Sequence, residues 1–91
     1  MRIQWNEDKR QKVLTERSLD FADLEDLLNQ PYIEDQSLSY SEQYRIIGFA
    51  RGRLATFIVE YRQDALGDFI WVVTAWRSTL QEQKSYEQET Q

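Results

Sequence analysis

One arginine follows directly after the most apolar stretch of the sequence. The run FIWVVTAW (69–76) is typical of a β-strand, and Arg77 separates it from a polar segment that we predict to be helical. A guanidinium group at the end of a strand can bind an anion, because its planar fork matches two phosphate oxygens at once. Arg45 and Arg53 lie on or beside two other runs of strand formers. If these runs are consecutive strands, we expect the three arginines to converge on one face of a sheet.

Two further polar side chains follow Arg77 at helical spacing. A helix capped by Ser78 or Thr79 would place Glu82 and Tyr86, four residues apart, on one face. Tyr86 can act as an acid or base only where neighbouring arginines favour its ionised form, and Glu82 can orient or replace it. The alternative is structural: the Tyr86 ring packs on the sheet, and the strand-end arginines are solvated or paired with acids.

The order of elements that would position these residues predicts an α+β fold. An N-terminal strand (2–5) precedes two helices, of which the second begins at Asp20. The segment 31–40 is either an edge strand or a loop. An antiparallel β-meander with turns at Gly52 and Gly67 follows, and a C-terminal helix ends the chain. The second helix is expected to cover the sheet, because its apolar residues recur at helical spacing: Phe21, Leu24, Leu27 and Leu28.

Length and composition limit the possible functions. The 91 residues, 41% of them hydrophobic, suffice for one small domain spanning residues 1–91. The absence of cysteine and histidine excludes disulfides, thiolate zinc sites and histidine acid-base chemistry, so we expect no metal and no cofactor. No apolar run approaches the length of a membrane span, and the N-terminus lacks the apolar core of a signal peptide. We therefore expect a cytoplasmic protein.

The charge is unevenly distributed along the sequence. The net charge of −5 argues against a generic nucleic-acid binder, whose affinity comes from bases that meet phosphates. Residues 16–43 contain eight acids and a single base, Arg17, whereas residues 44–77 contain five arginines and three acids. An acidic protein can thus still carry a basic face built from its strands. The acidic segment is either a solvated surface or a site for a basic partner.

Five short motifs follow one another along nearly the whole chain. They are IQWNEDK (3–9), LDFADLEDLLNQP (19–31), YRIIG (44–48), GRLATFIVEY (52–61) and VVTAWRSTLQEQKSYE (72–87). In this order and spacing they resemble the BrnT family, which consists of RelE-like ribonuclease toxins of type II toxin-antitoxin systems. The resemblance implies a RelE-like fold and metal-independent RNA cleavage that inhibits translation.

The resemblance also implies site residues and partners. Cleavage by a 2′-hydroxyl needs a base, cations that stabilise the charged phosphate, and an acid for the leaving oxygen. The implied partners are RNA, either free or on the ribosome, and a BrnA-like ribbon-helix-helix antitoxin, in a homodimer or a toxin-antitoxin heterotetramer. The implied catalytic residues are Arg45, Arg53, Arg77, Glu82 and Tyr86, and the implied RNA-binding residues are Trp5, Lys9, Arg17 and Arg51.

The sequence departs from the family pattern at polar positions. Glu16, Arg17 and Ser18 stand where family members usually have Lys-His-Gly, and Trp76 replaces the first of two paired arginines. These differences favour a second hypothesis, in which the BrnT-like fold has lost catalysis and acts as a protein-binding module. The ordered motifs disfavour a structural domain unrelated to the toxins.

Overall fold

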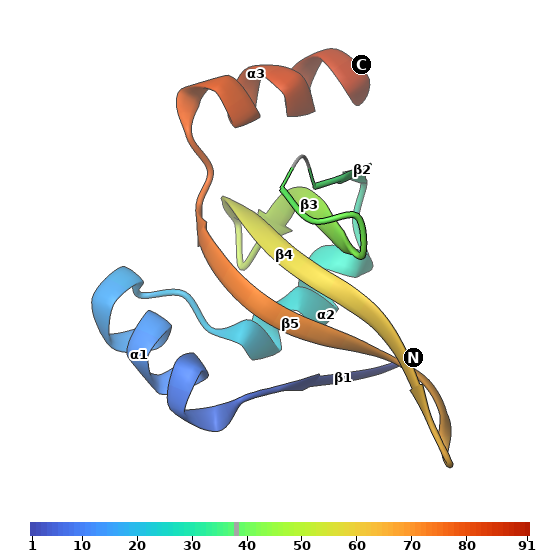
Figure 1. Ribbon diagram of the computed structural model, residues 1–91. Helices are drawn as coiled ribbons and strands as arrows, with labels where there is room; N and C mark the ends of the chain where they lie inside the picture. The colour runs from blue at the N-terminus through green and yellow to red at the C-terminus, as the bar shows by residue number, and fades with distance from the viewer. Residues whose placement is uncertain (38) are drawn as a thin grey trace.

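The computed structural model, which describes residues 1–37 and 39–91, is built around a five-stranded sheet (Figure 1). Along the sheet the strand order is β1-β5-β4-β3-β2. Strands β2 to β5 form an antiparallel meander, and β1 pairs with β5 in parallel. The strands are β1 (Arg2–Trp5), β2 (Tyr32–Gln36), β3 (Gln43–Ala50), β4 (Arg53–Asp64) and β5 (Gly67–Arg77).

Helices cover both faces of this sheet. One face carries α1 (Glu7–Arg17), the 3₁₀ turn η1 (Phe21–Asp23) and α2 (Leu24–Leu28). The other face carries α3 (Leu80–Glu89), which lies across the sheet from α1 (Figure 1). Polar residues at the end of β5 can therefore point toward either of two helical layers.

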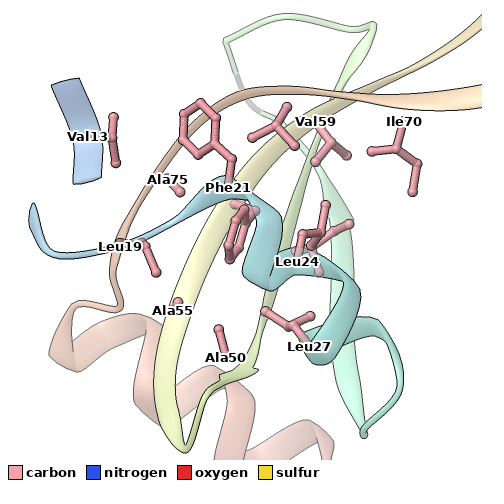
Figure 2. Close-up of a cluster of buried hydrophobic side chains, with 13 residues drawn as sticks. Val13, Leu19, Phe21, Leu24, Leu27, Ala50, Ala55, Val59, Ile70 and Ala75 are labelled. Carbon is pink, nitrogen blue, oxygen red and sulfur yellow. The ribbon is translucent and has the colours of Figure 1, made fainter. Parts of the chain in front are cut away.

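The main core lies between the sheet and the N-terminal helices. Phe21, Leu24 and Leu27 are fully buried there and face Val59 of β4 (Figure 2). A smaller cluster beneath α3 consists of Ile33, Ile47 and Tyr86, with Leu54 at its edge. The apolar cluster on the α3 side is smaller, and the buried polar residues Thr56, Ser78 and Glu82 lie on that side.

The α+β prediction and the order of its elements are confirmed. The predicted second helix is a 3₁₀ turn followed by a short α-helix, and its three-residue spacing buries both Phe21 and Leu24. Within the segment 31–40 the edge-strand alternative holds for Tyr32–Gln36, while residue 38 lies outside the described residues. No helix in the described part of the chain is long and apolar enough to cross a membrane.

Gly48 lies where α2 crosses the sheet closely. A Cβ atom at this position would lie 3.0 Å from Cγ of Leu27 and 3.0 Å from Cβ of Tyr32, and the latter atom moves only with the backbone of β2. We expect Gly48→Ala to lower the free energy of unfolding by about 1–3 kcal/mol, as overpacking does. Urea denaturation measures this loss. An unchanged midpoint would mean that α2 and β2 can separate at no cost.

Candidate functional site

Arg77 ends β5 on the face that α1 covers. It pairs with Ala55, which is buried in the main core, and directly paired residues of antiparallel strands share a face. Nη2 of Arg77 donates a hydrogen bond of 2.6 Å to the carbonyl oxygen of Ser18. Ser18 ends α1 in a left-handed conformation (φ 53°), and its N–H donates to the carbonyl of Leu14. The C-terminus of α1 therefore holds the Arg77 side chain, and its dipole favours a cation there.

Two other arginines join Arg77 at this end of the sheet. Nη1 of Arg17 donates to the carbonyl of Ala75 at 2.8 Å, so the last residue of α1 is bound to β5. Arg53 begins β4 two residues before Ala55, the cross-strand partner of Arg77. In the described residues, none of Arg17, Arg53 and Arg77 forms an ion pair with a carboxylate. We refer to these three residues as the arginine cluster.

The charge of the arginine cluster is incompletely compensated. Partial burial lowers the pKa of Arg77 from its ordinary value, the charge of Arg53 lowers it further, and Asp23 acts in the opposite direction. Arginine nevertheless stays protonated in proteins, so the cluster remains cationic. One oxygen of Asp23 is engaged by another arginine, because Oδ1 accepts from Nε of Arg51 at 3.1 Å. An anion bound at the cluster would supply the missing negative charge.

The opposite face of the sheet holds a polar network beneath α3. Thr79 and Glu82 form a capping box at the start of α3. Oε1 of Glu82 accepts hydrogen bonds from the Thr56 hydroxyl at 2.9 Å, the Trp76 indole N–H at 3.0 Å and the Thr79 N–H at 2.9 Å. Glu82 is only 6% exposed. The capping box thus joins α3 to β4 and β5 through one carboxylate oxygen.

Arg45 lies beside this network, at the edge of a cleft. Its Nε and Nη2 donate to the two carboxylate oxygens of Asp35 at 3.0 and 2.6 Å, and Nη1 lies 3.6 Å from Oε2 of Glu82. The hydrogen bond to Asp35 raises the pKa of Arg45, and the charges of Asp35, Glu82 and Glu89 add to the effect. The cleft has a volume of about 450 Å³, and we call it the α3 cleft. It is lined by Asp35, Gln36, Ser37, Arg45, Ile58, Trp76 and Glu82.

The expectation that Arg45, Arg53 and Arg77 converge on one face is wrong. Arg53 pairs with Ala50 and Arg77 with Ala55, and both alanines are buried in the main core. Arg45 instead belongs to the α3 face, where it approaches Glu82. Side chains alternate between faces along a strand, so the register of pairing decides which arginines meet.

Tyr86 is bound into the smaller core. Its hydroxyl donates to the carbonyl of Pro31 at 2.8 Å, and its ring packs edge-to-face on Phe49 with 5.5 Å between centroids. In the described part of the chain, no hydrogen bond joins Tyr86 to Glu82 or to an arginine. The geometry matches the packing alternative for the ring, while the hydroxyl is bonded to the backbone.

The predicted RNA-binding residues are dispersed. Trp5 donates its indole N–H to Glu7 at 3.0 Å and packs against the main core. Lys9 precedes Arg17 by eight residues on α1, which corresponds to about 12 Å of helix. Arg51 lies in the turn before β4 and is paired with Asp23. Of these four residues, the structure brings only Arg17 into the arginine cluster.

Comparison with known proteins supports this fold. No protein-family model and no curated protein matches the sequence. Among solved structures, the chain is similar to the ribonuclease toxin BrnT of Brucella abortus, with a TM-score of 0.66 and 23% sequence identity. The match covers 87% of this chain and 97% of that chain. The chain has a BrnT-like fold. The resemblance inferred from the five motifs is confirmed at the level of the fold.

Sequence reasoning missed the α3 cleft of this BrnT-like fold. It assigned Glu82 to orient or replace Tyr86, whereas Glu82 binds Thr56 and Trp76. The spacing of Thr79 and Glu82 is that of a capping box, and this signal could have revealed the role of Glu82 at the helix start. No local signal indicated that Asp35 would meet this group.

Proposed function

We propose that the chain is the toxin of a type II toxin-antitoxin system, an endoribonuclease that acts as one domain over residues 1–91. It cleaves RNA without a metal ion or cofactor and so inhibits translation. The BrnT-like fold supports this proposal, since the similar structure is that of a ribonuclease toxin. The observation that carries it is the arginine cluster: three arginines lie at one end of the sheet, and none of them is paired with a carboxylate in the described residues.

In this proposal the arginine cluster binds the scissile phosphate. The bond from Arg77 to Ser18 uses Nη2, which leaves Nε and Nη1 available for phosphate oxygens. The hydrogen bond from Nη1 of Arg17 to the Ala75 carbonyl likewise holds the Arg17 guanidinium in place. Cations held in place before the reaction stabilise the charge that develops on the phosphate without reorganising. Their contribution is therefore larger in the transition state than in the bound substrate.

Proton transfer requires a group on the same side of the sheet. The charge of Asp23 acts on Arg77, and one of its oxygens, Oδ2, makes no hydrogen bond within the described residues. We assign to Asp23 the proton from the attacking 2′-hydroxyl, while the 5′-oxygen, whose bond to phosphorus breaks, takes a proton from solvent water. Glu82 and Tyr86, which the resemblance implies as catalytic residues, are held by other bonds on the α3 side of the sheet. They take part only if RNA passes around the end of β5.

The proposal includes a ribbon-helix-helix antitoxin of the BrnA type as the partner. The resemblance implies this partner, and it implies either a homodimer or a toxin-antitoxin heterotetramer. The substrate is RNA, free or on the ribosome, which agrees with the cytoplasmic location expected from the sequence.

RNA binding by the arginine cluster predicts a defined dependence on salt. Each phosphate neutralised in a single strand contributes about 0.7 to the slope of log K against log salt. We expect Arg53→Ala to reduce the slope by about this amount. Fluorescence anisotropy of a labelled 2′-O-methyl RNA, which lacks the attacking hydroxyl, measures binding without cleavage. Arg62→Ala is the matched control, because Arg62 is bound to Glu60 near the far end of β4. Equal slopes for the wild type, Arg53→Ala and Arg62→Ala would show that the arginine cluster does not bind RNA.

A second candidate function is a protein-binding module without catalysis. The observation that favours it is that Arg45 is paired with Asp35 and that the Tyr86 hydroxyl is bonded to Pro31. Expression that leaves cell growth unaffected, together with tight binding of a ribbon-helix-helix protein, would support this function. Growth arrest that the same partner relieves would exclude it.

A further inference from the structure

The α3 cleft carries the opposite charge from the arginine cluster. Two carboxylates, Asp35 and Glu82, and one guanidinium, Arg45, line it, so its net charge is −1. Glu89 lies close enough for its charge to act on Arg45 as well. A phosphate would meet repulsion in this cleft, whereas one added cation would neutralise it. The cleft and the cluster therefore suit different ligands.

Glu82 presents one carboxylate oxygen to the cleft without a hydrogen bond. Its side chain is 7% exposed, and its three hydrogen bonds all go to Oε1. Within the described residues, Oε2 forms an ion pair with Nη1 of Arg45. The two atoms are 3.6 Å apart, which is too far for a hydrogen bond. Two nitrogens of Arg45 are already committed to Asp35. Glu82 is largely buried but lines the cleft, so its free oxygen can accept hydrogen bonds from a ligand that enters there.

The walls of the cleft favour a flat cation on an apolar stem. The indole N–H of Trp76 already donates to Glu82, so a ligand in the cleft can contact Trp76 through its ring. A cation can bind to the face of such a ring. Ile58 supplies an apolar surface beside it. A guanidinium can donate to Oε2, stack on the indole and lay its methylene groups along Ile58.

We propose that the α3 cleft receives an arginine side chain of the protein partner, which under the proposed function is the antitoxin. A nucleobase could also stack on Trp76, but the RNA backbone would bring phosphates to a face where Asp35, Glu82 and Glu89 already gather. Charge complementarity therefore favours a protein segment. The antitoxin then docks on the face opposite the arginine cluster, and the RNA site remains open to solvent or is closed by another part of the partner.

The Trp76 indole N–H provides a direct readout, because its hydrogen-bond acceptor is Glu82. We would titrate ¹⁵N-labelled protein with N-acetyl-L-arginine amide and follow the three indole resonances, assigned with Trp76→Phe. The Trp76 resonance is expected to shift with a Kd of about 1–10 mM, which is typical of one side chain without its protein. Trp5 donates to Glu7, and Trp71 lies under Arg62, so both serve as internal references that do not shift.

Matched ligands and variants separate the possible outcomes. N-acetyl-L-citrulline amide has the same shape without the charge and is expected to bind at least tenfold more weakly. Glu82→Gln and Asp35→Asn each remove one negative charge and are expected to weaken arginine binding at least tenfold. Glu25→Gln on α2 is the control and should leave it unchanged. If Glu82→Gln does not fold, Asp35→Asn on the cleft rim carries the test.

Three results would overturn the inference. The first is a Trp76 resonance that does not shift up to about 50 mM of the arginine compound. The second is an equal shift with the citrulline compound. The third is a lower Kd for guanosine than for the arginine compound, which would make the cleft a nucleobase site. The titration involves no RNA cleavage. A protein that binds the arginine compound but cleaves no RNA would therefore refute the proposed nuclease and leave the cleft assignment standing.

Discussion

Arg77→Ala is expected to lower the rate of RNA cleavage by two or more orders of magnitude. The reason is that Arg77 is a cation of the arginine cluster that the Ser18 carbonyl holds in place. Removal of one preoriented group that stabilises transition-state charge typically costs about 10²–10³ in rate. Arg77→Lys should recover only part of the rate, because an ammonium keeps the charge but lacks the planar fork. Single-turnover cleavage of labelled RNA, with and without translating ribosomes, measures the effect.

The control for this prediction must show that the variant is folded. Arg77 makes one hydrogen bond to the Ser18 carbonyl, so its removal should cost only about 0.5–1.5 kcal/mol of stability. Circular dichroism and thermal unfolding check this. Arg62→Ala, which also removes an arginine from the sheet, should cleave at the wild-type rate. Unchanged cleavage by Arg77→Ala would show that the arginine cluster is not the catalytic site.

Phe57→Ala is expected to lower the free energy of unfolding by about 3–5 kcal/mol. Phe57 lies on β4 in the middle of the sheet, is fully buried, and pairs with Ile46 and Ala75 of the neighbouring strands. Truncation leaves a cavity that these packed neighbours fill only partly. Because small domains are stable by only about 5–15 kcal/mol, the loss is a large fraction of the total. Urea denaturation monitored by tryptophan fluorescence measures it.

Phe49→Ala is the matched control for this second prediction. Phe49 lies on β3, is 39% exposed, and packs its ring against Tyr86 on the α3 side. Phe49→Ala should therefore lower the free energy of unfolding by less than Phe57→Ala does, because the Phe49 side chain buries less apolar area when the protein folds. Equal losses would mean that the α3 layer holds the fold as strongly as the main core does.

Most of the local structure was predictable from the sequence, because it depends on residues that are close together in the chain. The turns at Gly52 and Gly67 both have positive φ, as hairpin turns favour. Asn6 caps α1 by accepting from the N–H of Lys9, and Thr79 caps α3. Strand alternation and turn residues thus predicted the meander and the helices that flank it.

Which polar groups meet depends on pairing and packing between distant parts of the chain. The parallel pairing of β1 with β5 joins residues more than sixty positions apart, and no local pattern encodes it. Register places Arg77 and Arg53 on one face and Arg45 on the other, because side chains alternate with a period of two. The packing of α1 then brings Arg17 to Ala75, two residues before Arg77, and the packing of α3 encloses Glu82 with Asp35 and Trp76. Local sequence patterns thus specify which elements form and which residues are cationic, while long-range pairing separates a basic cluster from an acidic cleft.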